Sequence, residues 1–183
     1  MRKLILLLLA YILFSCSINK NEKMNKTQFN FYTEYNQFYI EDKGSNGDTG
    51  SAEFWSEEAI INRLALDDGI IGVGTQSYGN IKGEITILDK PTTDINFDLY
   101  DHIVEGGINI KSGELQILNC PDNNLELSIK VECGKYRVRV YGLNFSSVKE
   151  TDLAHDSDND FYKIEIWKSE DMQRKVLKQW EDN

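Results

Sequence analysis

The sequence contains few of the side chains that most often carry out chemistry. Only two histidines, His102 and His155, occur in 183 residues. A G-x-S-x-G motif, which presents a nucleophilic serine on a sharp turn, is absent, and the nearest stretch, residues 74–79, lacks the first glycine where it is needed. His155 precedes Asp156, as a base next to its orienting carboxylate would, but no nucleophile lies near it in sequence. The sequence therefore predicts a protein that is not an enzyme.

Long apolar runs are also scarce, and the one that occurs is at the amino terminus. Residues 1–16 read MRKLILLLLAYILFSC: a basic start, an apolar stretch and a serine, followed by Cys16. This is the organisation of a secretory signal, and its final cysteine makes it similar to a bacterial lipoprotein signal with residues 13–16 as the lipobox. The resemblance implies removal of residues 1–15, lipid on Cys16, and a place in the bacterial cell envelope, at the outer membrane or cell surface. The alternative, a membrane-spanning helix, needs about 20 apolar residues.

Cysteine is rare, and its spacing excludes one class of site. Besides Cys16 there are only Cys120 and Cys133, with no CxxC pair and no Cys/His cluster, so neither a structural zinc site nor another cofactor is expected. An exported protein meets oxidising conditions, and the two cysteines follow neighbouring predicted strands. A Cys120–Cys133 disulfide and two free thiols both remain open, because sequence does not give their Cα distance.

Basic side chains are in the minority. The chain has 20 Lys+Arg and 30 Asp+Glu, and removal of Arg2 and Lys3 with the signal leaves a net charge of about −12. A generic nucleic-acid-binding protein needs a basic surface, so direct nucleic-acid binding is excluded. The acidity permits a basic protein partner through electrostatic steering. Acidity that only aids solubility is the alternative.

The remaining chain is predicted to form a polar tether, residues 16–28, and a single β-rich domain, residues 29–183. Apolar and polar residues alternate with a period of two along most of this domain, which is typical of β-strands. Short strands at regular spacing favour a mainly β fold, an antiparallel β-sandwich of the jelly-roll kind. The clearest alternating positions are Phe29, Phe31, Tyr35, Tyr39; Ile81, Ile85, Ile87; Leu125, Leu127, Ile129, Val131; Tyr136, Val138, Val140; and Tyr162, Ile164, Ile166.

One clear α-helix is predicted over residues 56–67. Ser56 is a favourable N-cap, and Gly69 suits the left-handed conformation that often ends a helix. A second, short helix is predicted near the carboxyl terminus, where three apolar residues have helical spacing: Met172, Val176 and Trp180.

Three alternating aspartates, Asp156, Asp158 and Asp160, look like the start of a calcium-binding loop. An EF-hand also needs glycine at its sixth position and an acidic residue at its twelfth, where this chain has Phe161 and Trp167. No metal site is therefore predicted. The three aspartates remain weak candidates for a different oxygen cage, with a plain acidic loop as the alternative.

Aromatic residues on the predicted strands suggest a second kind of binding surface. An exported, lipid-anchored β-domain could stack sugars on exposed tyrosine and tryptophan rings. The same alternation is what a hydrophobic core requires. The aromatic residues in question are Tyr32, Tyr35, Tyr39, Tyr141 and Trp167.

The order of these parts resembles a known family. An aromatic strand and a glycine-rich loop are followed by WSEEA at residues 55–59, a helix that closes on DG at residues 68–69, the strand IIGVGT at residues 70–75 and GKYRV at residues 134–138. This arrangement is similar to the competence protein J (ComJ) family. The resemblance implies a β-sandwich-like fold and a general inhibitor or immunity role, because the namesake inhibits the DNA-entry nuclease. The lipoprotein signal, together with extra residues at 113–124, departs from the family and leaves the nuclease partner open.

The sequence thus favours a lipid-anchored, non-enzymatic binding protein that neutralises a basic nuclease or toxin. The acidic residues nearest the best-matched segment are expected to contact this partner. Capping and solvation of the helix is the alternative role for them. They are Glu57, Glu58, Asp67 and Asp68. An envelope lipoprotein that binds glycan or another ligand through surface aromatics is the alternative function.

Overall fold

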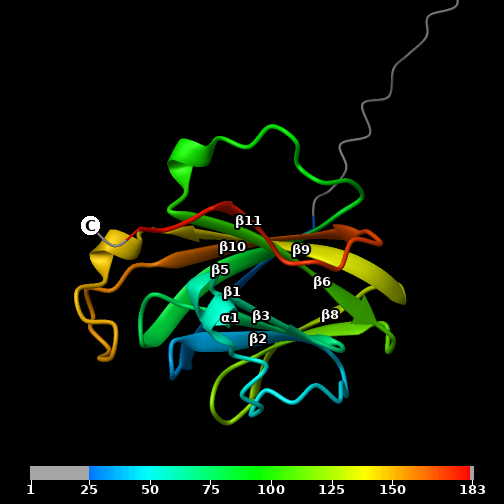
Figure 1. Ribbon diagram of the computed structural model, residues 1–183, viewed down its shortest axis with the longest axis horizontal. Helices are drawn as coiled ribbons and strands as arrows, with labels where there is room; N and C mark the ends of the chain where they lie inside the picture. Colours follow the sequence, from blue (N-terminus) through cyan, green and yellow to red (C-terminus); the bar gives the residue numbers. More distant parts are fainter. Residues whose placement is uncertain (1–24, 182–183) are drawn as a thin grey trace, which may run out of the picture.

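The computed structural model describes residues 25–181 as a mainly β protein in which two sheets pack face to face (Figure 1). The predicted β-sandwich is therefore confirmed. Within these residues, no helix has the length and apolarity needed to cross a bilayer. The lipoprotein signal, Cys16 and the first part of the tether lie outside the described residues.

The larger sheet has six strands in the order β1-β5-β10-β9-β6-β11. They are β1 (Asn25–Thr33), β5 (Gly79–Leu88), β6 (His102–Ile110), β9 (Gly134–Leu143), β10 (Phe161–Lys168) and β11 (Lys175–Lys178). Neighbouring strands are antiparallel except β5 and β10, which are parallel. This pair departs from the purely antiparallel sandwich that the sequence predicted.

The smaller sheet has five antiparallel strands in the order β3-β4-β2-β7-β8. They are β2 (Gln37–Asp42), β3 (Leu64–Asp67), β4 (Ile70–Gly74), β7 (Glu114–Leu118) and β8 (Leu125–Lys130). Three short helical segments join the strands: α1 (Glu57–Ile61) and the 3-10 turns η1 (Phe97–Leu99) and η2 (Phe145–Ser147).

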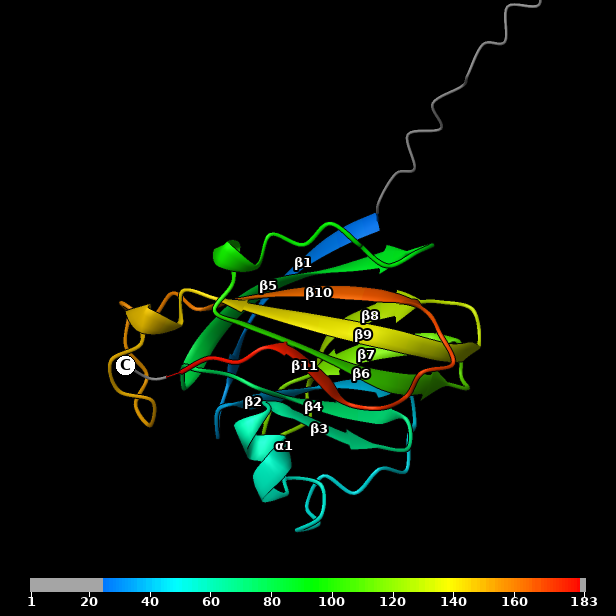
Figure 2. The same cartoon turned by 45° about the horizontal axis from the view of Figure 1, so that its top comes forward.

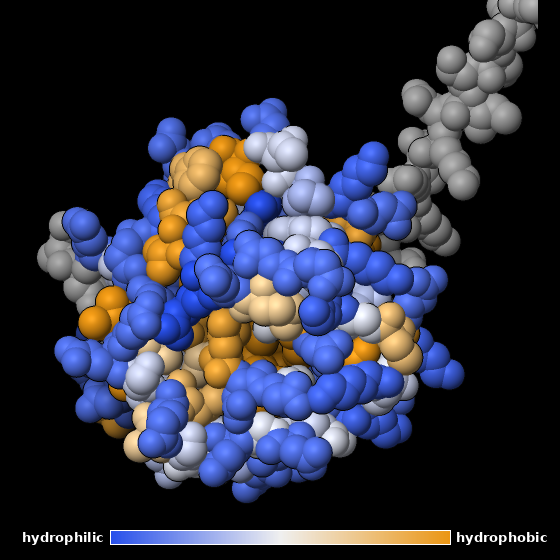
Figure 3. Space-filling model, turned by 45° about the vertical axis from the view of Figure 1, so that its right-hand side comes forward, coloured by the Kyte–Doolittle hydropathy of each residue, from blue (hydrophilic) through white to orange (hydrophobic). Residues whose placement is uncertain are grey.

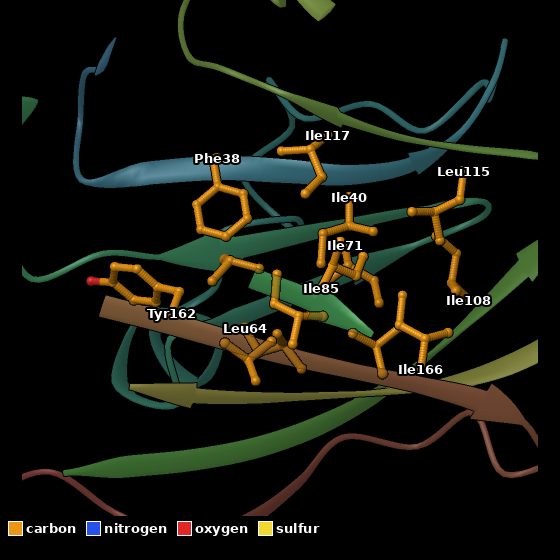
Figure 4. Close-up of a cluster of buried hydrophobic side chains, with 14 of the residues drawn as sticks. Phe38, Ile40, Leu64, Ile71, Ile85, Ile108, Leu115, Ile117, Tyr162 and Ile166 are labelled. Atoms are coloured by element: carbon orange, nitrogen blue, oxygen red, sulfur yellow. The ribbon is translucent and has the colours of Figure 1, made fainter. Parts of the chain in front are cut away.

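Alternation along the strands divides the buried residues between two hydrophobic clusters. Phe38 and Ile40 of β2 point into the main core between the sheets, where Figure 4 shows them facing side chains of β5 and β10. Tyr39, between them in sequence, points to the outer face of the smaller sheet because successive strand residues alternate sides. There it packs with Phe54 and with Ala59 of α1.

The strand registers define two ends of the sandwich. The turn between β1 and β2, the start of β10 and the start of β3 share one end, which we call the β1–β2 end. Figure 1 shows the loop between η2 and β10 at this same end, on the left. The start of β1 and the ends of β2, β5, β8 and β10 lie at the opposite end.

The predicted helix over residues 56–67 is too long. Ser56 is the N-cap, as expected, and its Oγ accepts the backbone N–H of Ala59 at 3.3 Å. The helix ends after one turn, however, and Leu64–Asp67 form β3. Asp67 pairs with Ile70, so that Asp68 and Gly69 make a two-residue hairpin turn. Gly69 has φ +74°, and thus its left-handed conformation serves a β-hairpin rather than a helix end.

Two other predicted segments are also corrected. The residues expected to form a carboxyl-terminal helix include β11, an edge strand in which Val176 pairs with Val104 of β6. Residues 25–28, expected to belong to the tether, are part of β1, where Thr27 pairs with Ile85. A backbone partner therefore overrides the helical spacing in one case and the polar composition in the other.

A buried charge cluster covers the outer face of the larger sheet. Glu105 of β6 accepts hydrogen bonds from two arginines of β9, from Arg137 Nε at 3.0 Å and Arg139 Nε at 2.6 Å. Glu165 of β10 lies 3.6 Å from Arg139. Burial raises the pKa of Glu165, but hydrogen bonds from Lys163 and Tyr141 and the charge of Lys163 outweigh this and hold it below its usual value.

Candidate functional site

A surface groove of about 670 Å³ lies at the β1–β2 end beside α1. Its lining comes from the β1–β2 turn, from α1, from the end of β4 and from the carboxyl-terminal segment. Most of the lining is apolar or aromatic, which is typical of a recognition surface. The residues that define its character are Tyr35, Trp55, Ile60, Ile61, Arg63 and Trp180.

The shortness of α1 exposes its two isoleucines to this groove. Ala59 is the buried residue of the single turn, while Ile60 and Ile61 are 61% and 56% exposed. Ile60 and Ile61 have helical spacing with Leu64 and Ala65, but α1 ends at Ile61, so no longer helix forms to bury them in one apolar stripe. Apolar side chains this exposed at the rim of a groove mark a contact surface rather than a core.

A buried histidine joins the two walls of the groove. His102 Nε2 lies 3.1 Å from the carbonyl oxygen of Asn62, which follows α1, and its Nδ1 accepts the backbone N–H of Trp180 at 3.3 Å. Burial, with a smaller contribution from the charge of Arg63, lowers the pKa of His102 to about 4, although the hydrogen bond to Asn62 acts in the opposite direction. The imidazole is therefore neutral at physiological pH, which lets one nitrogen accept and the other donate.

Arg63 is held in place at the base of the groove. Its Nη1 donates to the carbonyl oxygen of Thr75 at 3.1 Å, and its guanidinium lies 5.0 Å from the ring centroid of Phe145. Its Nη2 also donates to the side-chain oxygen of Gln76. These contacts fix the junction between α1 and β3, and they limit how far the arginine can extend toward a ligand.

Three tyrosines lie near Glu34 beside the groove. In β1 and β5, Thr33 pairs with Gly79, so that Glu34 and Tyr78 face each other just beyond the ladder. Tyr35 is 63% exposed and Tyr32 is 46% exposed. Loss of water around the hydroxyl, a hydrogen bond to Glu34 and the neighbouring tyrosines raise the pKa of Tyr78 to about 12.

An acidic loop continues this surface. Residues 150–160 carry five carboxylates, and the loop is joined to the β1–β2 turn by Asn36, whose Nδ2 donates to the carbonyl oxygen of Thr151 at 2.7 Å. His155 lies 3.3 Å from Glu150, not beside Asp156 as a base–orienter pair requires. The loop therefore adds negative charge, and the carboxylate next to the imidazole is Glu150 rather than Asp156.

The three aspartates of this loop have separate structural roles. Asp158 accepts the backbone N–H of His155 at 3.0 Å, and Asp156 is exposed. Asp160 is buried and accepts the Tyr162 hydroxyl at 2.6 Å. Over residues 25–181, no three His, Cys, Asp or Glu side chains are grouped so that they could hold a metal ion.

The four acidic residues expected at an interface do not form one patch. Glu57 and Glu58 lie at the start of α1, beside the groove, and Glu58 pairs with Arg174 at 2.8 Å. Asp67 and Asp68 lie at the far end of β3, away from α1 in Figure 2. Asp68 pairs there with a lysine, so only the glutamates adjoin the candidate site.

Lysines gather at the opposite end of the sandwich. There they form ion pairs with nearby carboxylates, in which the distance between the lysine Nζ and the carboxylate oxygen is 2.6–3.1 Å. The pairs are Lys26–Glu84, Lys43–Glu114, Lys111–Asp68 and Lys135–Glu170. A second groove of about 440 Å³ opens at this end, with an apolar floor and a hydrophilic rim, and Figure 3 shows apolar surface recessed between hydrophilic side chains on this side. Several carboxylates of this end are thus paired with lysines, whereas residues 150–160 add five carboxylates to the β1–β2 end.

The two cysteines are free thiols, so the disulfide does not form in this structure. Cys120 follows β7 and is buried, whereas Cys133 follows β8 and is exposed. Because β7 and β8 are antiparallel, the ends of consecutive strands lie at opposite ends of the hairpin. The two cysteines follow neighbouring strands, as predicted, and are separated for that reason.

The aromatic residues considered for sugar stacking are not gathered on one surface. Tyr39, Tyr141 and Trp167 are buried, and only Tyr32 and Tyr35 are exposed. Two further aromatic residues, Trp55 and Trp180, line the groove together with Tyr35. Sequence reasoning missed this grouping because the contributing segments are far apart in the chain.

The two-sheet architecture of this chain has counterparts among solved structures. Neither a family model nor a curated protein matches the sequence. Among solved structures, the chain is similar to ComJ from Bacillus subtilis, described as an inhibitor of the DNA-degrading activity of NucA, with a TM-score of 0.59, 17% identity, and coverage of 78% of this chain and 96% of that one. It also matches a protein described as Crocagin biosynthetic gene J, with a TM-score of 0.45, 15% identity, and coverage of 78% and 95%. The resemblance predicted from sequence is thus confirmed for the fold.

Proposed function

We propose that this chain is a non-enzymatic inhibitor or immunity protein that neutralises a basic nuclease or toxin, and that lipid on Cys16 holds it in the bacterial envelope. The ComJ-like fold supports the inhibitor role, since ComJ inhibits a nuclease. The lipoprotein-like sequence of residues 1–16 supports the anchor.

The observation that carries the proposal is the composition of the β1–β2 end. An apolar groove, exposed aromatic rings and excess carboxylates adjoin one another there. Protein interfaces combine a desolvated apolar and aromatic centre with a polar rim, and a few such residues supply most of the binding energy. Ile60, Ile61 and Tyr35 form the centre, and Glu57 lies on the rim.

The charge of this surface indicates the kind of partner. A nuclease holds its substrate through a basic surface that contacts phosphates. An acidic protein can cover such a surface, because complementary charges speed association and favour the correct orientation. The same acidity repels nucleic acid, so the chain acts on the protein rather than on its substrate.

The direct test measures inhibition of NucA and of basic nucleases and toxins from the organism that makes this chain. Binding is measured at increasing salt for the wild type and for Ile61→Ser, with Leu99→Ser as the control, because Leu99 is similarly exposed but lies in η1 outside the groove. We expect Ile61→Ser to weaken binding by about tenfold or more, as for a central contact residue. Equal effects of the two substitutions would exclude the groove as the contact surface.

The anchor is tested separately in cells. Wild-type protein should incorporate labelled fatty acid and sediment with membranes, and Cys16→Ser should do neither. Labelling that survives this substitution would contradict lipidation of Cys16. Because binding is measured on the domain, this outcome leaves the inhibitor role standing.

The alternative function, a glycan-binding lipoprotein, retains Tyr32, Tyr35, Trp55 and Trp180 as a stacking surface. The acidic surroundings favour a basic protein over neutral sugar. Binding on a glycan array that Tyr35→Asn abolishes, without inhibition of any nuclease, would support the alternative.

A further inference from the structure

Glu34 occupies an unusual position on the β1–β2 end. It follows the last residue of β1, and the alternation along this strand places it on the same outward face as exposed Tyr32, with half-buried Tyr78 opposite it just beyond the ladder. Exposed Tyr35 is the next residue of the turn. The carboxylate therefore has aromatic neighbours on its own segment and on the facing one.

The surrounding rings come from two adjacent strands and are fixed by the sheet. The pairing of Tyr32 with Asn80 and of Thr33 with Gly79 places Tyr32 and Glu34 on one face of the sheet and Tyr78 opposite Glu34. Gly79 has φ +122°, and a Cβ there would lie 3.6 Å from the Tyr32 ring and 2.7 Å from Ala154 of the acidic loop. The acidic loop therefore packs directly beside the tyrosines.

Over residues 25–181, the salt bridges of lysine and arginine involve carboxylates other than Glu34. An ionised carboxylate accepts several hydrogen bonds, so Glu34 can accept from the head of an incoming cation. Glu105 of the larger sheet differs from Glu34 in this respect, because it is already paired with Arg137 and Arg139 of the same chain.

We propose that Glu34 and the rings of Tyr32, Tyr35 and Tyr78 form a receiving site for one arginine or lysine side chain of a basic protein partner. The carboxylate pairs with the cationic head, and the aromatic faces pack against the head and the aliphatic stem. This inference rests on the proposed function, and it names which part of the surface recognises the partner's charge.

The chemistry favours a cation of this shape. Guanidinium and ammonium groups are attracted to aromatic faces as well as to carboxylates, and the attraction grows as water is excluded. Arginine suits the site better, because its planar group can bond to the carboxylate and stack on a ring at once. The acidic loop, residues 150–160, attracts a basic partner at longer range and does not occupy the same position as Glu34.

Two measurements test this proposal on the purified full chain. The first is binding of a blocked arginine-rich peptide, compared with the same peptide carrying citrulline in place of arginine. It is measured at about 0.15 M salt, which is the physiological ionic strength. The second is inhibition of NucA. Both are made for the wild type, Glu34→Gln and Tyr35→Asn, where asparagine tolerates the positive φ of that turn position. The matched control is Glu132→Gln, which removes one negative charge at the opposite end of the sandwich.

We expect the arginine peptide to bind and the citrulline peptide to bind much more weakly. Glu34→Gln and Tyr35→Asn should each weaken binding by about tenfold, whereas Glu132→Gln should change it by less than about twofold. No binding of the arginine peptide to the wild type, or equal losses from Glu34→Gln and Glu132→Gln, would overturn the proposal.

The two measurements separate this proposal from the proposed function. Inhibition of NucA that Glu34→Gln leaves intact would overturn the receiving site and keep the inhibitor role. Peptide binding that depends on Glu34, without inhibition of any nuclease or toxin tested, would support the receiving site and contradict the inhibitor role.

Discussion

The backbone N–H of Trp180 donates a hydrogen bond to Nδ1 of His102, at 3.3 Å, and thereby joins the carboxyl-terminal segment to the larger sheet. The other imidazole nitrogen contacts the carbonyl oxygen of Asn62, next to α1. A single side chain thus holds both walls of the groove. Trp180 packs in turn on Phe145 with its ring edge-on, at a centroid distance of 5.7 Å.

This arrangement predicts a dependence of stability on pH. The pKa of His102 is about 4 in the folded protein, against 6.5 for an ordinary histidine. Between these values the unfolded chain binds the extra proton, so the free energy of unfolding falls as pH drops from about 6.5 to 4, by on the order of 3 kcal/mol. Urea unfolding of the wild type and His102→Gln at several pH values measures it. The difference between them should shrink toward pH 4, and a constant difference would contradict the assignment. His155→Gln, at an exposed histidine, is the control.

The shared carboxylate of the buried charge cluster predicts a large loss of stability on its removal. Glu105→Gln leaves Arg137 and Arg139 without the anion that both contact, and breaking a buried ion pair in this way costs about 3–5 kcal/mol. The control Glu132→Gln breaks an exposed pair with Lys168 and should cost less than about 1 kcal/mol. Thermal and urea unfolding compare the two. Similar small losses would show that the cluster is solvated.

Gly83 of β5 is expected not to tolerate a side chain. A Cβ at this glycine would lie 2.2 Å from the Phe29 ring and 2.4 Å from the Tyr162 carbonyl oxygen, and the backbone atom has little freedom to move. We expect Gly83→Ala to destabilise the protein by about 2 kcal/mol or more through overpacking. Gly50→Ala is the control, since its Cβ would meet only an aspartate oxygen at 3.4 Å. Equal unfolding midpoints for the two variants would rule out the tight packing described at β5.

The two free thiols predict different reactivities. In protein carrying Cys16→Ser, a thiol reagent should modify exposed Cys133 rapidly and buried Cys120 only as fast as the protein opens. Reducing agent should leave the melting temperature unchanged. Mass spectrometry after proteolysis identifies the modified residue, and a linked Cys120–Cys133 peptide from untreated protein would refute the free-thiol state.

Period-two alternation was sufficient to predict most strands and the sandwich itself. Ile81 and Ile85 face the core and alternate with the polar residues Lys82 and Glu84 on the other face of the sheet, so the sequence carries the strand signal directly. The parallel pairing of β5 with β10 has no such signal, because register between strands that are far apart depends on the whole sheet.

The errors in the helices have an identifiable origin. Ile60, Ile61, Leu64 and Ala65 have helical spacing. Leu64 and Ala65 nevertheless belong to strand β3, in which Leu64 and Leu66 lie on one face and Ala65 on the other. The following Asp68-Gly69 is a strong hairpin signal. Short apolar runs fit either period, and the turn decides between them.

The candidate site was predicted only in part. The glutamates of α1 do lie beside it, whereas the aspartates after β3 lie elsewhere. Glu34 and Tyr78 meet because two strands pair, and Trp180 reaches the groove because the carboxyl-terminal segment crosses to His102. Such meetings depend on tertiary pairing, which a single sequence does not report.

The parallel pair at the centre of the larger sheet also governs when this domain can fold. β10 lies between β5 and β9, so a chain that stops before Phe161 leaves both without the neighbour they share. Folds in which distant segments must meet form slowly and cooperatively, because loop closure precedes the contacts that stabilise it. We therefore expect the nascent domain to complete its larger sheet only after its last long strand has been synthesised, a timing that suits the proposed export of the chain.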